Sequence, residues 1–409
     1  MTVGYSEAPS FGRAAPIVRG FTASGSIGMY GSERFAMARR QSAYHQKYIE
    51  LGAELVDRIG YDAPYSFTTT EQEHIATRTA AGMYDVYHQG MVEIRGKEAE
   101  ALLQRTIVND ITRIGDGKVL YSSICNEAGG IVDDLTIYRL SGDQFWLSPT
   151  PSRVDAVVDW LTGKAQGANA YVTNLVSGSG FISVQGPCSR SIVGSMTDAD
   201  LSTDALPYYS FTRATMAEVP GIIARTGYSG ELGYEFFYPR EYGAHVWDAV
   251  MTAGKPHGLV PCGLGALRSV RIEKRYPLYG LDLNESTSPL EANLGWTVRF
   301  DKGEFVGRDA LLRQKESGVS RTLVAIEFPS FDFLPATGND VTFDGESVGT
   351  VTSGDRGFFV GKSIALAYLT PEFGNTGTTV TVTSAAGETA DGVVNTKAAY
   401  DPNREKARG

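Results

Sequence analysis

The chain has 409 residues, 42% of them hydrophobic, which is enough to bury a sizeable core and predicts two or three domains. Its formal net charge of −10 comes from 47 acidic and 37 basic residues, without long runs of one sign. This balance argues against nucleic acid and against a membrane surface as the principal partner.

Three cysteines, Cys125, Cys188 and Cys262, lie far apart and cannot all pair within the chain. Such usage is typical of a reducing compartment. Neither a signal peptide nor a stretch of about 18 apolar residues is present, so we expect a cytoplasmic protein. The five histidines form no closely spaced pair, and the sequence therefore predicts no metal site.

The first 40 residues are rich in Gly, Ser and Ala and lack a hydrophobic period, which predicts an N-terminal arm. The segment "EQEHIATRTAAGMYDV" then predicts a helix that ends at its glycine, Gly82.

One supersecondary unit occurs twice in the middle of the chain. In "MVEIRGKEAEALLQRTI" and again in "FISVQGPCSRSIVGSM", a short strand meets a glycine and an amphipathic helix follows. Each copy continues with a hairpin and a second helix. The repeat predicts two α+β halves, each an antiparallel sheet with helices on one face.

After "FVGRDALLRQK" the chain changes to short β-branched runs separated by Gly, Asp and Asn, such as "TLVAIEF" and "GTTVTVTSA". These runs predict an all-β module, a small barrel or jelly roll.

Two acids stand side by side in the predicted strand "IVDDLTIYRL". Strand side chains alternate, so Asp134 would share a face with Val132, Thr136 and Tyr138, while Asp133 would point to the aliphatic side. We therefore expect chemistry from Asp134 alone, with a proton-accepting role beside Thr136, Tyr138 and Tyr121. The structural alternative is that Asp134 caps the preceding turn or pairs with a core arginine.

Three further features stand out. The glycines of "RTGYSGELGYEFF" predict a tight turn with close backbone approach, and the strand that follows directs Glu235 to one face, where it could accept two N–H donors from a flat heterocycle. The charges of "ALRSVRIEKRYPLYG" are expected on a solvated helix face. Trp296 is expected on a strand, packed in the core.

Taken together, these residues resemble the aminomethyltransferase family, which comprises the glycine cleavage T-protein and its tetrahydrofolate-dependent relatives. The resemblance runs in order from about residue 47 to the end through "ELGAELVDRIGYDAP", "GMYDVYHQG", "GGIVDDL", "RTGYSGELGYE", "PLEANLGW", "FVGRDAL" and "VTSGDRGFFVGKSIALAYL".

The resemblance implies a three-domain cloverleaf around a central hole, with two ferredoxin-like α+β domains and a C-terminal β-barrel or jelly-roll domain. Adding the arm, we expect these segments: 1–40; 41–90 with 178–312; 91–177; and 313–409.

The resemblance also implies roles for individual residues. Asp134 would be catalytic, beside the folate nitrogens that carry the one-carbon unit, and Asp133 structural. Glu235 would accept hydrogen bonds from the pterin. Tyr121, Tyr138, Tyr228 and Trp296 match positions that line the folate pocket.

Several positions depart from the T-protein pattern around the mouth where the donor enters. They are Tyr87, His88 and Gln89, then Thr150, and "GALR" at 265–268. We take the first four as candidate substrate residues. The departures argue against docking of a lipoyl carrier protein and favour a small-molecule methyl donor.

The leading hypothesis from the sequence is a tetrahydrofolate-dependent methyltransferase that demethylates a small O-, N- or S-methyl compound. One alternative is a glycine cleavage aminomethyltransferase that takes its one-carbon unit from a lipoyl carrier. A second is a folate-binding subunit or assembly factor without chemistry of its own.

Overall fold

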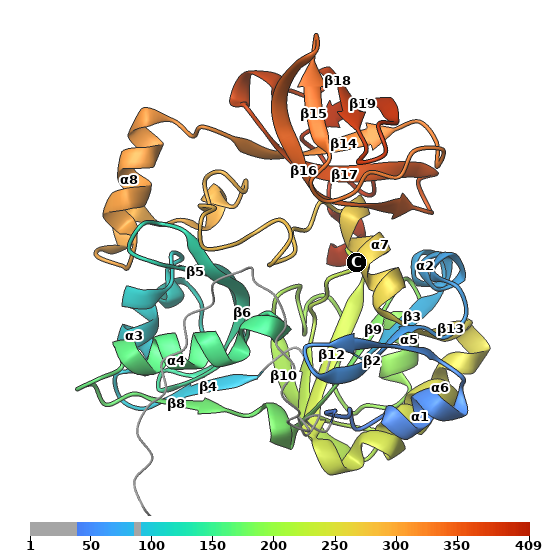
Figure 1. Ribbon diagram of the computed structural model, residues 1–409. Coiled ribbons are helices and arrows are strands. Elements are labelled where there is room, and N and C mark those ends of the chain that lie inside the picture. The colour runs from blue at the N-terminus through green and yellow to red at the C-terminus, as the bar shows by residue number, and fades with distance from the viewer. Residues whose placement is uncertain (1–38, 86–90) are drawn as a thin grey trace, which may run out of the picture. The chain divides into compact units, whose positions relative to one another are not determined.

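The computed structural model describes residues 39–85 and 91–409. Its strands form a short hairpin, two larger sheets and a closed barrel (Figure 1). The hairpin consists of β1 (Glu54–Arg58) and β2 (Tyr61–Ser66), preceded by α1 (His45–Glu50). The α+β class and the C-terminal barrel are confirmed, whereas the exact domain boundaries stay a prediction.

The first of the larger sheets has five antiparallel strands in the order β5-β6-β7-β4-β8. Its elements are β4 (Val92–Arg95), α3 (Ala99–Thr106), β5 (Val119–Cys125), β6 (Ile131–Ser141), β7 (Gln144–Ser148), α4 (Val154–Lys164) and β8 (Tyr171–Asn174). Helix α3 buries Ala99, Leu102, Leu103 and Thr106. Because this spacing of three and four residues forms one stripe, the helix packs that stripe on the sheet and creates a core with α4.

The second sheet has six strands in the order β10-β11-β12-β9-β3-β13. Its elements are α2 (Thr70–Thr79), β3 (Ala81–Tyr84), β9 (Ser179–Gln185), α5 (Ser189–Gly194), β10 (Phe211–Met216), β11 (Val219–Ala224), β12 (Gly233–Pro239), α6 (Gly243–Gly254) and β13 (Leu259–Cys262). Helices α1, α5 and α6 pack on it through a core that includes Trp247.

The strand orders reproduce the predicted duplication, with one difference. Four strands follow the same order in both sheets, β5-β6-β7-β4 and β10-β11-β12-β9. In the second sheet, however, β3 pairs with β9, and β13 is added in parallel to β3 at the edge of the sheet. The prediction that a helix ends at Gly82 is therefore wrong, because α2 ends earlier and Gly82 lies within β3.

The C-terminal barrel closes in the order β14-β17-β16-β15-β18-β19. Its strands are β14 (Thr322–Phe328), β15 (Asp340–Phe343), β16 (Glu346–Gly357), β17 (Lys362–Leu369), β18 (Thr379–Thr383) and β19 (Thr389–Asn395), flanked by α8 (Arg308–Ser317) and α9 (Glu405–Arg408). Helix α7 (Leu264–Glu273) contacts β16 and β17 on one side and α2 and β2 on the other. It therefore connects the barrel to the second sheet (Figure 1).

Candidate active site

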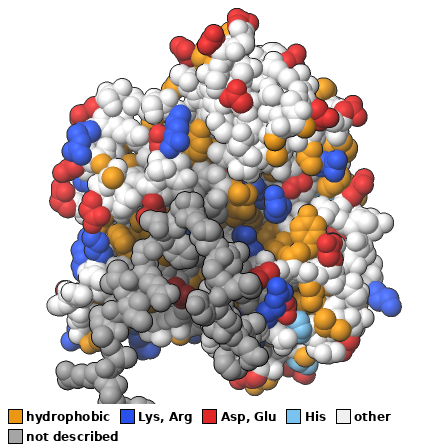
Figure 2. Space-filling view, in the orientation of Figure 1, with side chains coloured by type: hydrophobic (Ala, Val, Ile, Leu, Met, Phe, Trp, Pro, Cys, Tyr) orange, Lys and Arg blue, Asp and Glu red, His pale blue; other side chains and the backbone are white. Residues whose placement is uncertain are grey.

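A large cavity lies where these parts meet. Its volume is about 1200 Å³, and it is lined by residues of both sheets, the β1–β2 hairpin, α7, the 276–296 loop and the C-terminal segment. The space-filling view shows hydrophobic and Lys or Arg side chains gathered in a hollow beneath the barrel (Figure 2). Pockets that hold one small ligand measure roughly 300–1,000 Å³, so this cavity has room for two reactants.

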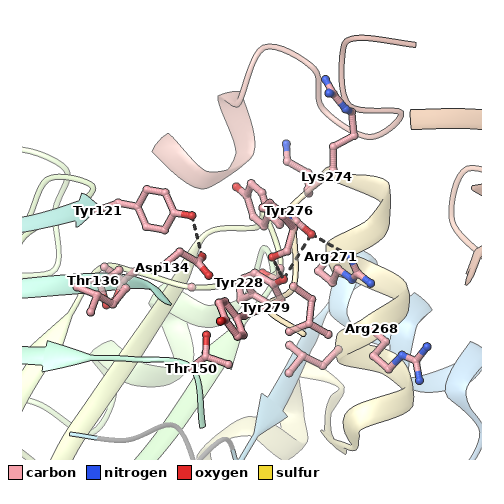
Figure 3. Close-up of a pocket in the computed structure, with 18 of the residues that line it drawn as sticks. Tyr121, Asp134, Thr136, Thr150, Tyr228, Arg268, Arg271, Lys274, Tyr276 and Tyr279 are labelled. Atoms are coloured by element: carbon pink, nitrogen blue, oxygen red, sulfur yellow. Dashed lines mark hydrogen bonds between the residues drawn. The ribbon is translucent and has the colours of Figure 1, made fainter. Parts of the chain in front are cut away.

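Asp134 projects into the cavity from β6 and is held by a phenol from the neighbouring strand. Tyr121 on β5 lies opposite Thr136 of β6. Its hydroxyl donates a 2.8 Å hydrogen bond to Oδ2 of Asp134, which precedes Thr136 by two residues on β6 (Figure 3). Burial raises the pKa of Asp134 to about 6, although the hydrogen bond from Tyr121 acts to lower it. This carboxyl group can therefore hold or release a proton near neutral pH.

Asp133 faces away from the cavity and is fully buried. Its Oδ2 accepts a 2.8 Å hydrogen bond from the main-chain N–H of Thr150, while Oδ1 has no partner among the described residues. Burial, and then the charge of Asp134, raise the pKa of Asp133 well above its ordinary value. The opposite orientation of the two acids agrees with the expected alternation.

The expected position of Val132 is wrong, because the strand carries a bulge. Ile124 pairs with Asp133 but Cys125 pairs with Ile131, which leaves Val132 as the extra residue. Its side chain packs in the aliphatic core of this sheet instead of sharing a face with Asp134. A bulge inserts one residue and so reverses the alternation on one side of it.

Trp296 extends the aromatic wall beside Asp134. Its ring stacks on Tyr121 with centroids 5.9 Å apart and an interplanar angle of 21°. The expectation of a core residue on a strand is wrong, since Trp296 lies in the 3-10 turn Gly295–Thr297 and is 53% exposed. Such a partly exposed indole can cover a flat ligand at the mouth of the cavity.

Glu235 lies in the floor of the cavity, on β12 between Ser183 of β9 and Ala224 of β11. Its Oε2 accepts hydrogen bonds from the hydroxyl of Thr226 and, at 3.3 Å, from that of Tyr138. No hydrogen bond reaches Oε1 from any described residue. Burial raises the pKa of Glu235.

Tyr138 does not line the cavity, contrary to its expected place in the folate pocket. It is 1% exposed and packs between Phe211 and Phe237 with its hydroxyl on Glu235. The side chain supports Glu235 from behind, because the strand face that carries it turns into the core between the two sheets.

Tyr228 lies in the loop between β11 and β12 and lines the cavity. Its hydroxyl donates a 2.6 Å hydrogen bond to the carbonyl oxygen of Pro277, and its ring stacks on Tyr276 at 5.7 Å. The expected close backbone approach occurs at Gly227 and Gly233, where an added Cβ would lie 2.1 and 2.2 Å from Gln185 Oε1.

Three charged residues at the C-terminal end of α7, Arg271, Glu273 and Lys274, are buried and paired, so the prediction of a solvated helix face is wrong for them. Arg271 is 1% exposed and forms a 2.7 Å ion pair with Asp282. Glu273 binds Arg78 at 2.9 Å, and Lys274 donates to Asp401. The Arg271–Asp282 pair joins α7 to the 276–282 loop, and the other two pairs join the end of α7 to α2 and to the C-terminal segment.

The remaining candidates divide into two groups. Thr150 lines the cavity, whereas Tyr87, His88 and Gln89 lie outside the described residues.

The sequence analysis missed several lining residues, among them Arg58, Tyr209 and Tyr279. Tyr279 could have been noticed in the aromatic run "YPLYG". Arg58 and Tyr209 carry no local signal, because only the tertiary fold brings them to the cavity.

The described residues contain neither a metal-binding cluster nor a membrane-spanning helix. Within 39–85 and 91–409, no group of three or more His, Cys, Asp or Glu side chains is arranged to hold a metal ion. In the same residues no helix has the length and apolar character needed to cross a membrane.

Comparisons with known proteins agree with this architecture. Residues 44–302 match the GCVT N-terminal domain, and residues 321–401 match the glycine cleavage T-protein C-terminal barrel domain. An aminomethyltransferase of Halothermothrix orenii is 37% identical over 81% of this chain and 92% of its own length. One from Streptomyces coelicolor is 39% identical over 83% of this chain and 91% of its own length.

A solved structure shows the same fold. The glycine cleavage system aminomethyltransferase T from Bartonella henselae superposes with a TM-score of 0.81 at 25% identity, over 89% of this chain and 98% of that one. The chain therefore belongs to the aminomethyltransferase (GCVT) family of transferases, whose one-carbon chemistry uses tetrahydrofolate.

Proposed function

We propose that this protein transfers an aminomethyl unit from a lipoyl carrier protein to tetrahydrofolate. The names of its relatives favour this reaction over a generic demethylation, which was the leading hypothesis from the sequence. The carbon would leave the lipoyl sulfur and its own amino group and bond to two folate nitrogens. Those nitrogens give up two protons, so the products are methylenetetrahydrofolate, ammonia and the free thiol.

The residues present fit tetrahydrofolate. The unused Oε1 of Glu235, in the cavity floor, is an acceptor suited to the N–H edge of a pterin. The stacked rings of Tyr121 and Trp296 offer a flat wall for an aromatic ligand. When bound, tetrahydrofolate supplies the nucleophilic nitrogens, and the protein supplies position and charge.

The observation that carries the proposal is that Asp134 and Glu235 line the same cavity. Asp134 can hold a proton on its carboxylate and, once ionised, offset positive charge that develops on the donor. Tyr121 keeps that carboxylate in one orientation through its hydrogen bond. Glu235 orients the acceptor, and alignment of the two reactants would supply much of the rate.

A second candidate is demethylation of a free, anionic small molecule, and two arginines favour it. Arg58 and Arg268 both line the cavity, and burial together with the charge of Arg268 lowers the pKa of Arg58. Within the described residues Arg58 forms no ion pair, and the carboxylate nearest to Arg268 is Asp355 at 3.9 Å. Two such guanidinium groups are suited to a donor carboxylate.

A carrier-dependence assay separates the two candidates. The purified enzyme is incubated with tetrahydrofolate and either an aminomethylated lipoyl carrier protein or free N-, O- and S-methyl acids. Release of ammonia and methylenetetrahydrofolate only with the carrier is the expected result. Turnover with a free methyl acid, lost in Arg58→Ala and Arg268→Ala, would replace the proposal by the second candidate.

A further inference from the structure

His74 is a fully buried histidine that takes no part in the proposed chemistry. It lies on α2, and its ring contacts both α7 and the barrel. Nδ1 is 2.7 Å from the hydroxyl oxygen of Ser269 on α7, and Nε2 is 3.1 Å from Oε1 of Glu273 at the end of the same helix. Phe358, in the loop between β16 and β17, meets the ring edge-on with centroids 5.7 Å apart. The ring is therefore part of the joint between the barrel and the second sheet.

Glu273 is an ionised partner of this ring. Its Oε2 accepts a 2.9 Å hydrogen bond from Arg78, and its Oε1 accepts hydrogen bonds from the N–H groups of Phe359 and Val360 at 3.1 and 3.2 Å. Burial acts to raise the pKa of Glu273, but the hydrogen bonds and charges of His74 and Arg78 outweigh it and lower that pKa. A carboxylate with these donors has no proton to give to His74.

The hydrogen bonds around His74 place a proton on each ring nitrogen. A serine hydroxyl has one hydrogen, and Ser269 donates it to the carbonyl oxygen of Arg356. Nδ1 must therefore be the donor in its contact with Ser269. The N–H of Phe359 lies closer to Oε1 of Glu273, at 3.1 Å, than to Nε2, at 3.4 Å. Nε2 must donate to Oε1 as well, because an unprotonated nitrogen would turn its lone pair toward a carboxylate oxygen 3.1 Å away.

The charge balance of the buried cluster gives the same answer. Arg78 forms 2.9 Å ion pairs with Glu231 and Glu273, and these three residues and His74 are at most 4% exposed. With a neutral His74, one arginine would stand against two glutamates, and an uncompensated charge in the interior is costly. With an imidazolium, the charges of the four groups sum to zero.

Charged side chains of three elements lie around the ring. Arg78 belongs to α2 itself, Glu273 to α7 and Asp355 to β16. Arg268 lies 3.9 Å from Asp355 and offsets its charge. The carboxylate left for His74 to balance is therefore that of Glu273.

Arg78 connects this cluster to the cavity. It donates 2.9 Å hydrogen bonds to the carbonyl oxygens of Ser229 and Val270 as well as to the two glutamates. Ser229 follows Tyr228, and both residues line the cavity. The charge of His74 is thereby linked, through Glu273 and Arg78, to the loop that forms this part of the wall.

We propose that His74 is a buried imidazolium ion, and that its second proton locks the barrel loop 356–360 and the Tyr228 loop onto α7. Removal of that proton at alkaline pH would leave a bare nitrogen against Glu273 and a net negative charge in the interior. The lock would then open, so that the joint responds to pH. This inference does not depend on the identity of the ligand.

Nitrogen NMR of the full chain, labelled with ¹⁵N-histidine, tests the charge directly. Contacts between ring protons and Phe358 identify the signals of His74. At about pH 7.5 both of its ring nitrogens should carry a proton and show the imidazolium shift. A His74 ring with one unprotonated nitrogen at that pH would overturn the inference.

Hydrogen exchange tests the lock itself. His74→Gln cannot carry the charge, so the amides of 356–360 and 226–231 should exchange at least about fivefold faster than in the wild type. His257→Gln, at an exposed position, is the control and should leave both segments unchanged. Wild-type exchange rates in both segments of His74→Gln would refute the lock. If that variant does not fold, the wild type is compared between about pH 7 and about pH 10, corrected for intrinsic exchange, with the same two outcomes.

Discussion

Asp133 and Asp134 are identical side chains that strand alternation places in different surroundings. Asp133 is fully buried, with one oxygen on the N–H of Thr150. Asp134 faces the cavity, where its carboxylate is oriented by Tyr121. We infer that the first acid holds the chain segment at Thr150 in place and that the second handles the proton.

Replacing Asp134 by Asn tests this assignment. The variant keeps the shape and the hydrogen bond from Tyr121 but cannot take up a proton, so turnover should fall about 10²- to 10⁴-fold. Tetrahydrofolate affinity should stay within a few-fold of wild type in calorimetry. A strong loss of affinity would instead make Asp134 a binding residue.

The pH dependence follows from the pKa of Asp134. We propose that the ionised form of Asp134 is the active one, so kcat/KM should fall as pH drops below about 6, by up to tenfold per pH unit. Tyr121→Phe removes a hydrogen bond that lowers this pKa, so its profile should shift to higher pH. A profile flat between pH values of about 5 and 8, or unshifted in the variant, would argue against this role.

The contribution of Asp134 to folding stability should decrease as pH rises, whereas kcat/KM should increase. The pKa of Asp134 is above the roughly 3.9 of an unfolded chain, so the folded state binds the proton more tightly. The contribution of this group to stability is therefore present below about pH 4 and is lost as pH rises to about 6. The melting temperature of Asp134→Asn minus that of the wild type should therefore be larger at about pH 8 than at about pH 4. An equal difference at both pH values would contradict the shift.

At the scale of elements, the turn before β6 is hydrogen-bonded to the loop that contains Glu285 and Thr287. Asn126 Nδ2 donates to the carbonyl of Glu285, and Ile131 N–H donates to that of Thr287. Gly130 lies against this loop, where an added Cβ would come within 1.8 Å of the Glu285 carbonyl oxygen. The loop can therefore pack here only against a residue without a side chain.

Gly130→Ala should accordingly lower the free energy of unfolding by about 1–3 kcal/mol and reduce turnover, as the loop is displaced. Gly142→Ala, in the next turn of the same sheet, is the matched control, because its Cβ would meet nothing closer than 3.7 Å. It should change stability by less than about 0.5 kcal/mol. Chemical denaturation of both variants checks the difference, and equal stability would refute the account of the turn.

Local patterns in the sequence predicted most elements but not their irregularities. Alternation in "IVDDLTIYRL" correctly separated Asp133 from Asp134, yet it could not show the bulge at Val132, which depends on the partner strand. The charges of α7 look solvated in sequence. Arg271 is buried because Asp282, eleven residues further along the chain, folds back onto it.

At the scale of the whole molecule, the duplicated unit and the terminal barrel could be predicted because each is local in sequence. The insertion of β3 beside β9 could not, since it joins segments almost 100 residues apart. The same holds for the cavity. Arg58, Tyr209 and Trp296 come from three distant segments, and family resemblance pointed only to the last of them.

The central claim is that this cavity binds tetrahydrofolate with Glu235 as the acceptor in its floor. Calorimetric titration of the wild type and of Glu235→Gln with tetrahydrofolate tests it most directly. We predict micromolar binding to the wild type, weakened at least about tenfold in the variant, because one carboxylate oxygen becomes a donor. No binding at millimolar tetrahydrofolate, or equal binding by both proteins, would contradict the account.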